Sequence, residues 1–159
     1  MKSIYLIRHA QSNAVNSATG YDRPLSEKGL KDAEQISKKV KEYNFSPTLI
    51  YCSPAKRTLT TSSFFNYNTV SVFEKSIYEA TLLDLTELIN AFPSEHNQIA
   101  LIGHNPSISL LASYLTGDDK LIQISPCTVI KINLDVDNWN EITQGIGTQE
   151  YYLSPENLS

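Results

Sequence analysis

Short apolar runs that favour β-strands alternate along this chain with longer segments of helical periodicity. The strand-like runs are rich in β-branched and aromatic residues, and they lie at Ser3–Ile7, Thr48–Cys52, Thr69–Phe73 and Gln98–Ile102. The segments between them carry apolar residues at steps of three and four, which is the spacing of one face of an α-helix. This alternation predicts an α/β fold, a three-layer α/β/α sandwich whose mostly parallel central sheet is covered by helices on both faces.

Four helices are expected, and two of them have a sequence signal at their start. Ser26 is placed to cap the first helix, over Glu27–Tyr43, and Ser53-Pro54 is placed to open the second as N-cap and first helical residue. The other two expected helices lie at Leu82–Phe92 and Pro106–Thr116. The apolar stripe expected to face the core from the first helix consists of Leu30, Ala33, Ile36, Val40 and Tyr43.

The C-terminal region has the pattern of antiparallel strands. Residues Cys127–Leu134 alternate between apolar and polar side chains, which predicts a half-exposed edge strand. Asp137-Asn138 favours a turn into a last strand near Glu141–Ile146. The tail Tyr151–Ser159 is expected to be loosely held.

Length and composition limit the classes of protein that this chain can form. At 159 residues, with 41% apolar and 19% charged residues, residues 1–159 are expected to form one domain. The net charge of −4 argues against nucleic acid and anionic membranes as partners. No run approaches the roughly 18 apolar residues of a membrane span. Cys52 and Cys127 lie in apolar segments, so we expect buried free thiols and a cytoplasmic location.

Charged and titratable residues follow the predicted parallel strands. Arg8 and His9 come directly after the first strand, Arg57 soon after the second, Glu79 after the third and His104 after the fourth. The carboxyl ends of parallel strands meet at one edge of a sheet, where α/β proteins bind ligands. Helix N-termini expected at this edge add their own positive potential. We therefore expect a locally electropositive crevice that binds phosphate.

Each of these residues also has a structural interpretation. A single histidine at a strand end is more often structural than catalytic, and Arg57 could pair with a surface carboxylate. Glu79 alone is typical of a solvated loop, and His96 is expected to be an ordinary loop residue. Their shared placement at one edge favours a functional role for all except His96.

Four segments resemble motifs of the histidine phosphatase superfamily, which has a phosphoglycerate mutase-like fold. They occur in the family's order, and they are Leu6–Ala10, Arg23–Gly29, Ser53–Thr61 and Ile102–Pro106. The first is similar to the Arg-His-Gly signature, with Ala10 where the signature has glycine, a residue that permits backbone conformations alanine resists. The resemblance covers nearly the whole chain and is greatest to the SixA branch of phosphohistidine phosphatases.

The resemblance implies roles for the residues at the sheet edge. His9 is implied as the nucleophile that carries the phosphoryl group as a covalent phosphohistidine. Arg8, Arg57 and His104 are implied to surround the phosphoryl oxygens, and Glu79 matches the family's proton donor. The arginines supply the positive charge that a cation would otherwise bring, so no metal or other cofactor is implied. Three histidines and two cysteines show no zinc-ligand spacing.

The resemblance also bears on the substrate. The intervals from Arg57 to Glu79 and from Glu79 to His104 leave no room for the lid insertion of the family's mutases and small-metabolite phosphatases. An open site favours phosphohistidine on a protein of the histidine phosphotransfer type. The alternatives are a general acid phosphatase acting on small phosphoesters, a mutase, and a non-catalytic module that binds phospho-ligands. Ser12 and Asn13 follow the signature and either donate to phosphate or face solvent.

Overall fold

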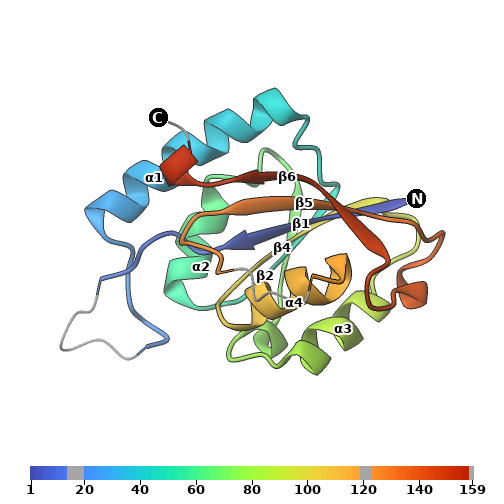
Figure 1. Ribbon diagram of the computed structural model, residues 1–159. Helices are drawn as coiled ribbons and strands as arrows, with labels where there is room; N and C mark the ends of the chain where they lie inside the picture. Colours follow the sequence, from blue (N-terminus) through green and yellow to red (C-terminus); the bar gives the residue numbers. More distant parts are fainter. Residues whose placement is uncertain (14–19, 119–122, 158–159) are drawn as a thin grey trace.

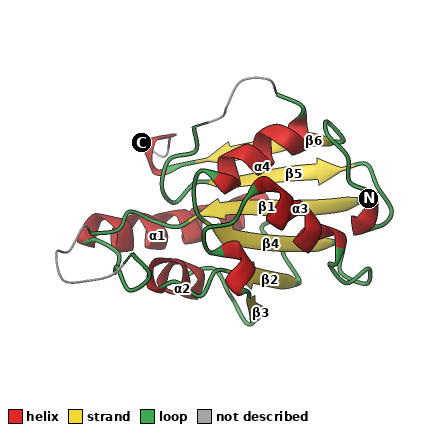
Figure 2. Cartoon of the chain, turned by 90° about the horizontal axis from the view of Figure 1, so that it is seen from below, coloured by secondary structure: helices red, strands yellow, loops and turns green. Residues whose placement is uncertain are grey.

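The computed structural model describes residues 1–13, 20–118 and 123–157. Six strands form one sheet in the order β3-β2-β4-β1-β5-β6, visible side by side in Figure 2. Strands β3, β2, β4 and β1 are parallel, and β5 runs antiparallel to both of its neighbours. The strands span β1 (Lys2–Arg8), β2 (Leu49–Cys52), β3 (Val70–Phe73), β4 (Gln98–Gly103), β5 (Val129–Leu134) and β6 (Gly147–Leu153).

Helices cover both faces of the sheet (Figure 1), which confirms the predicted α/β/α architecture. Alternate residues of β1 point to opposite faces. Ile4 and Leu6 are buried with residues of α3 and α4, whereas Tyr5 and Ile7 are buried with residues of α1 and with Phe65, which follows α2. The helices are α1 (Glu27–Lys39), α2 (Lys56–Ser63), α3 (Leu82–Asn90) and α4 (Ser107–Thr116). Short 3₁₀ helices are η1 (Val40–Tyr43), η2 (Lys75–Ile77), η3 (Trp139–Glu141) and η4 (Pro155–Asn157).

Helix α1 begins where predicted, but its buried face differs from the expected stripe. Ser26 caps the helix by accepting the Gly29 N–H at 2.9 Å. Leu30 and Tyr43 are exposed, and the buried face begins at Gly29 instead. A Cβ atom on Gly29 would lie 2.1 Å from the Gln11 carbonyl oxygen, so only glycine permits this close approach. The start of α1 is thereby packed against the loop that follows His9.

Helix α2 begins later than predicted. Its first residue is Lys56, and Ala55 occupies the N-cap position without a side-chain hydrogen bond. The expected cap at Ser53 is wrong, because the N-cap is Ala55. The Ser53 hydroxyl accepts the Ala55 N–H at 3.4 Å, ahead of the helix, and lies 2.8 Å from Nε2 of His104. The serine therefore belongs to the carboxyl end of β2 rather than to the helix.

Strand β5 is an interior strand, so the half-exposed edge predicted at Cys127–Leu134 is wrong. The predicted antiparallel edge strand is confirmed, but it is β6. Strand β5 lies between β1 and β6, and Lys131 on its polar face is only 9% exposed. The Lys131 ammonium lies 5.5 Å from the centre of the Tyr5 ring and 3.2 Å from Glu150. Because β6 pairs with β5, its Glu150 carboxylate lies beside the buried ammonium and offsets the cost of burying that charge.

The last strand lies later than the predicted Glu141–Ile146. Trp139 begins a 3₁₀ helix and is buried, and its indole N–H donates to the His96 carbonyl at 2.8 Å. Strand β6 then extends to Leu153, so Tyr151–Leu153 are held in the sheet, contrary to the expected loose tail. Residues 158–159 lie outside the described residues.

Both cysteines are buried free thiols, as predicted. Burial raises the pKa of Cys52 to about 12 and raises that of Cys127 further. Both side chains are therefore neutral thiols at neutral pH. Among the described residues, no helix is both long enough and apolar enough to cross a membrane.

Candidate active site

The register of the sheet brings the ends of three strands together. Arg8 of β1 lies opposite Gly103 of β4, and Cys52 of β2 lies opposite Ile102. The next residue along each strand therefore also lies beside its neighbour. The His9 N–H donates to the Gly103 carbonyl at 3.1 Å, and the Ser53 N–H donates to the Ile102 carbonyl at 3.1 Å. His9, Ser53 and His104 thus share one edge of the sheet.

The two histidines face each other at this edge. Their ring centroids are 5.3 Å apart with an interplanar angle of 55°. His9 is 8% exposed and His104 is 6% exposed, so both imidazoles are largely withdrawn from water. Buried polar groups require partners, and those partners determine which ring nitrogens carry protons.

The hydrogen bonds of His9 define its tautomer. Its Nδ1 lies 2.7 Å from the Ala10 carbonyl oxygen, which can only accept, so Nδ1 carries the proton. Its Nε2 therefore has a free lone pair in the neutral ring. The Arg57 Nε–H donates to this Nε2 at 3.4 Å. The lone pair of His9 thus faces the guanidinium of Arg57, a residue of α2.

Burial and positive charge keep His9 neutral. Its pKa falls from 6.5 to about 4, chiefly because burial disfavours the charged ring. The hydrogen bond to Ala10 opposes this shift, and the charges of Arg57, Arg8 and Arg23 reinforce it. At neutral pH the imidazole is unprotonated at Nε2, which is the form that acts as a nucleophile.

His104 is held by Ser53 and is also neutral. Its Nε2 lies 2.8 Å from the Ser53 hydroxyl, whereas its Nδ1 is buried without a partner among the described residues. Burial lowers the pKa of His104 to about 3, helped by the positive charges of Arg57 and Arg8. The negative charges of a bound phosphate dianion would oppose the positive charges of the arginines and favour a protonated His104 ring.

Two arginines supply fixed positive charge. Arg8 donates from a terminal nitrogen to the Ile124 carbonyl at 2.8 Å, and its Nε is buried with no partner among the described residues. Arg57 donates to the Gly20 carbonyl, and its guanidinium carbon lies 5.9 Å from the centre of the Tyr78 ring. Burial lowers the pKa of both arginines, yet guanidinium groups stay protonated in proteins.

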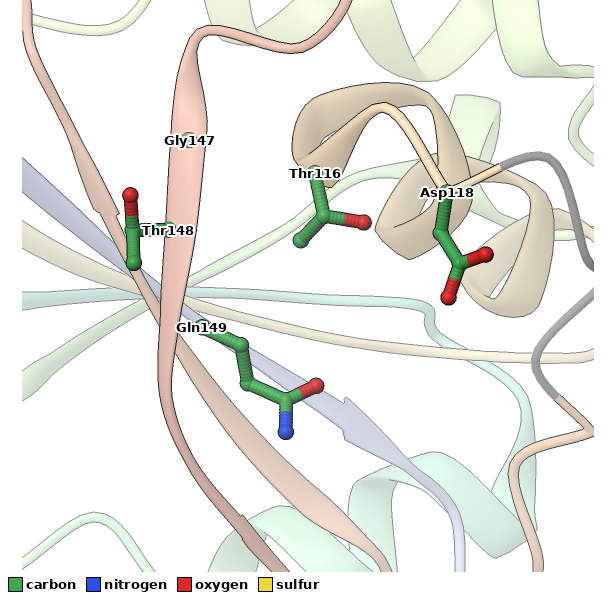
Figure 3. Close-up of a pocket in the computed structure, with 5 residues that line it drawn as sticks. All are labelled: Thr116, Asp118, Gly147, Thr148 and Gln149. Atoms are coloured by element: carbon green, nitrogen blue, oxygen red, sulfur yellow. The ribbon is translucent and has the colours of Figure 1, made fainter.

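A cavity of about 550 Å³ near the end of α4 has a different character (Figure 3). It is lined by Thr116, Asp118, Gly147, Thr148 and Gln149. These side chains include one acid and no base, which is unfavourable for an anion. We therefore place the candidate site elsewhere, at the sheet edge.

A cavity of about 530 Å³ opens at the sheet edge beside His104, and neither His9 nor Arg8 is in its lining. It is lined by Gly20, Arg23, Arg57, Tyr78, Glu79, Ala80, His104, Asn105 and Pro106. The structure thus brings Arg57, Glu79 and His104 to one cavity, and the positive charges of Arg8 and Arg57 act on His9. Glu79 is exposed and has φ of 54°, a left-handed conformation that is unusual outside glycine.

Ser12 and Asn13 lie in the loop after His9 and do not line this cavity. Ser12 forms an isolated bridge with Leu25, and the Asn13 N–H donates to the Pro24 carbonyl at 2.9 Å. These contacts join the loop to the segment before α1. Donation to phosphate by either side chain stays a prediction.

Sequence reasoning gave no site role to Arg23, Ser53 or Tyr78. Arg23 lines the cavity and acts electrostatically on both His9 and Arg57. The Tyr78 ring lies 5.4 Å from that of His104. Arg23 and Ser53 each precede a proline in a segment that resembles a family motif. That position was the sequence signal that could have identified them as site residues. No sequence signal distinguished Tyr78 from other tyrosines.

Ala10 fits its position without strain. Positive φ angles occur in the described non-glycine residues at Asn44, Asn68, Glu79 and Cys127, and not at Ala10. Ala10 is fully buried, and its N–H donates to the Thr61 hydroxyl at 3.0 Å. The glycine of the family signature is therefore not required for the backbone conformation beside His9.

Comparisons with known proteins find similarity over the N-terminal part of the chain. The family model described as "Histidine phosphatase superfamily (branch 1)" matches residues 4–76, which include Arg8, His9 and Arg57. A 2,3-bisphosphoglycerate-dependent phosphoglycerate mutase of Corynebacterium jeikeium is 39% identical over 64 residues. That match covers 38% of this chain and only 25% of the mutase.

Solved structures extend the similarity over the rest of the fold. A protein of Agrobacterium tumefaciens proposed to be the phosphohistidine phosphatase SixA has a TM-score of 0.84, with 24% identity, 97% of this chain and 98% of that chain covered. The protein histidine phosphatase SixA complexed with tungstate also has a TM-score of 0.84, with 16% identity and 99% of each chain covered. Residues 4–76 are thus similar to the histidine phosphatase superfamily. The fold of the chain is that of the SixA structures.

Proposed function

We propose that this protein is a phosphatase that acts through a covalent phosphohistidine at His9. One observation carries the proposal: the Nε2 lone pair of a neutral, buried His9 faces the Arg57 guanidinium at 3.4 Å. A nucleophile and a fixed positive charge at this separation match the needs of phosphoryl transfer, in which catalysis is mostly positioning and electrostatic stabilisation. The proposal gives each residue of the site a role.

In the first step, His9 Nε2 attacks phosphorus while the bond to the leaving group breaks. The bonding pair goes to the leaving group, and the Glu79 carboxyl supplies its proton. Arg8, Arg57 and His104 stabilise the charge on the phosphoryl oxygens. The Nδ1 hydrogen bond to Ala10 holds the ring and its tautomer during attack.

In the second step, water attacks the phosphorus of the phosphohistidine. The Glu79 carboxylate accepts a proton from that water, and the P–N bond breaks with its electron pair returning to His9 Nε2. The products are inorganic phosphate and the neutral histidine. The two proposed steps use water and the side chains of the site.

The proposed substrate is phosphohistidine on a protein of the histidine phosphotransfer type. Short connections support this choice, because η2 follows β3 directly and α3 alone separates Glu79 from β4. We propose that residues 1–159 form one histidine phosphatase domain without a lid insertion, which leaves the site open to a protein surface. Two buried thiols suit a reducing compartment, and we propose a cytoplasmic location.

A general acid phosphatase acting on small phosphoesters is the second candidate. The observation that favours it is Glu79 in the cavity wall. An alcohol leaving group requires a proton donor, whereas the P–N bond of phosphohistidine breaks more readily. The same nucleophile and arginines serve both reactions.

A paired assay separates the two candidates and tests the mechanism. The wild-type chain is assayed on a histidine-phosphorylated phosphotransfer domain and on phenyl phosphate. A higher kcat/KM on the protein supports the proposed substrate, and an equal or higher value on phenyl phosphate supports the second candidate. His9→Ala should abolish turnover and the acid-labile phosphoenzyme. His96→Ala is the matched control, because this loop histidine lies outside the site. Normal turnover by His9→Ala would overturn the mechanism.

A further inference from the structure

A second hollow adjoins the proposed phosphate site. It has a volume of about 370 Å³ and is lined by Tyr21, Pro54, Lys75 and Tyr78. Tyr78 also lines the cavity that contains Arg57 and His104. One side chain therefore separates the two spaces, and a substrate whose phosphoryl group lies in the first can extend past Tyr78 into the second.

Two aromatic rings form the walls of this hollow. The ring centroids of Tyr21 and Tyr78 are 5.2 Å apart, with an interplanar angle of 48°. Tyr21 is 41% exposed, so much of its ring is available for contact. Rings at this spacing offer faces and edges on which a planar group can stack.

The Tyr21 wall is fixed to the active site by its backbone. The Lys56 N–H donates to the Tyr21 carbonyl at 3.0 Å, and Arg57 donates to the carbonyl of the preceding Gly20. Both donors belong to the first turn of α2, which also supplies the guanidinium facing His9. The hollow and the phosphate site therefore share one rigid support.

Of the described residues that line this hollow, Lys75 alone is charged. It is exposed at the start of η2, and the ion pairs found among the described residues do not include it. A lysine ammonium beside two aromatic rings favours an anionic group on a planar ligand. Its charge adds to the positive potential of Arg57 on the other side of Tyr78.

We propose that Tyr21, Pro54, Lys75 and Tyr78 form a leaving-group subsite. It takes a planar ring attached to the phosphoryl group, stacked against Tyr21, with an anionic group beside the ring paired to Lys75. This inference rests on the proposed function, since it assigns the second half of the same substrate. The ring is the imidazole of phosphohistidine beside an acidic side chain, or the aryl group of a small phosphoester that carries a carboxylate.

Binding of non-hydrolysable phosphonates tests the subsite without requiring turnover. Methylphosphonate, phenylphosphonate and 4-carboxyphenylphosphonate are titrated into the wild type, Tyr21→Ala and Lys75→Ala by calorimetry. Tyr21→Ala should weaken both ring compounds by roughly 3- to 10-fold and leave methylphosphonate within twofold. Lys75→Ala should weaken only the carboxylated compound, by roughly 2- to 5-fold. Equal binding of all three compounds to the wild type and the variants would overturn the proposal.

Matched variants control for structural effects. Tyr43 is 42% exposed at the end of η1 and lines neither the hollow nor the phosphate cavity, so Tyr43→Ala removes a similar ring and should leave all three affinities unchanged. Lys38→Ala does the same for an exposed lysine of α1. If Tyr21→Ala weakens methylphosphonate as strongly as phenylphosphonate, Tyr21 acts by supporting Gly20 and Arg57, and the subsite is wrong.

Turnover then distinguishes the two sources of the ring. The kcat/KM of Tyr21→Ala is compared with that of the wild type on the phosphorylated histidine domain and on 4-carboxyphenyl phosphate. A loss confined to the protein identifies imidazole as the natural ring, and a loss confined to the small ester identifies an aryl group. A loss on neither overturns the subsite. Absence of any wild-type turnover contradicts the proposed function, while the phosphonate titrations still decide the subsite.

Discussion

The hydroxyl of Ser53 lies 2.8 Å from Nε2 of His104, across the neighbouring carboxyl ends of β2 and β4. Ser53 is fully buried and His104 is nearly so, which makes this contact a buried polar interaction. Helix α2 begins only at Lys56, and its N-cap residue Ala55 forms no side-chain cap. A serine that resembles a helix cap in sequence instead orients a histidine of the candidate active site.

Ser53→Ala should reduce turnover by leaving a buried nitrogen of His104 without its partner. An unsatisfied buried group costs about 1–3 kcal/mol, which corresponds to roughly 5- to 150-fold in kcat/KM. Steady-state kinetics on phenyl phosphate measure the effect. Ser63→Ala, at the exposed end of α2, is the control and should retain wild-type rates. Equal rates for both variants would show that Ser53 does not position His104.

Arg57→Ala should cause a larger loss than Ser53→Ala, because it removes a charge proposed to contact the phosphoryl oxygens. Loss of one such donor costs about 2.7–4 kcal/mol of barrier, or roughly 10²- to 10³-fold in kcat. Arg57→Lys should recover only part of this, since a single ammonium lacks the planar fork of donors. Lys56→Ala changes the exposed neighbouring cation and serves as the control. A tenfold or smaller loss in Arg57→Ala argues against direct contact.

Glu79→Gln should affect substrates according to their leaving groups. General acid catalysis contributes about 10²- to 10⁴-fold where the leaving group needs a proton. The loss should therefore be larger on an alkyl phosphate than on phosphohistidine. The ratio of kcat/KM values for the two substrates measures the role of Glu79, with the exposed Glu87→Gln on α3 as the control. An identical loss on both substrates would argue against proton donation.

Folding stability should fall as the pH is lowered through the range between the ordinary and the folded pKa of His9. That pKa is about 4 in the folded protein and 6.5 ordinarily. Between these values the unfolded chain binds a proton that the folded chain does not, so stability is full above 6.5 and declines as the pH falls. His104, with a pKa of about 3, extends the decline to lower pH.

Urea unfolding at a series of pH values measures this decline. Each unit by which a pKa is lowered accounts for about 1.4 kcal/mol. His9→Gln should therefore show a shallower fall in the free energy of unfolding between pH 6.5 and 4 than the wild type does. Carboxylates that titrate in the same range are common to both proteins and cancel in the difference. Parallel curves would contradict the assigned protonation of His9.

Ala10→Gly should destabilise the protein without increasing its activity. Ala10 has an ordinary negative φ, so glycine relieves no strain and only adds freedom to the unfolded chain. The expected loss is about 0.4–1 kcal/mol in the free energy of unfolding. Chemical denaturation and kcat on phenyl phosphate are measured together. A rise in kcat would show that the signature glycine has a role in the loop beside His9.

The strands and helices of the parallel half could be predicted because their signals are local. Residues 4–7 are all buried, on alternate faces of the sheet, as expected for a continuous apolar run between two helical layers. The cap at Ser26 likewise depends on residues three positions apart. Both cysteines are buried because their neighbours in sequence are apolar.

The C-terminal strands could not be placed in this way. The alternation of apolar and polar residues around Lys131 is typical of a strand with one exposed face. The sequence does not show that β6 pairs with this strand. Lys131 is buried because Glu150 on the neighbouring strand offsets its charge. The shift of the last strand to Gly147–Leu153 has the same cause, since Trp139 is drawn into the core by contacts with residues far away in sequence.

The sequence alone determined the layered α/β fold and the nature of the residues at its edge, because periodicity and motif spacing are written along the chain. The tertiary structure decided how those residues act. Strand register placed His9 beside His104, a carbonyl of Ala10 selected the His9 tautomer, and Ser53 turned from the helix to the second histidine. These are contacts across neighbouring strands, and burial changes the charge of each histidine only once the sheet has assembled.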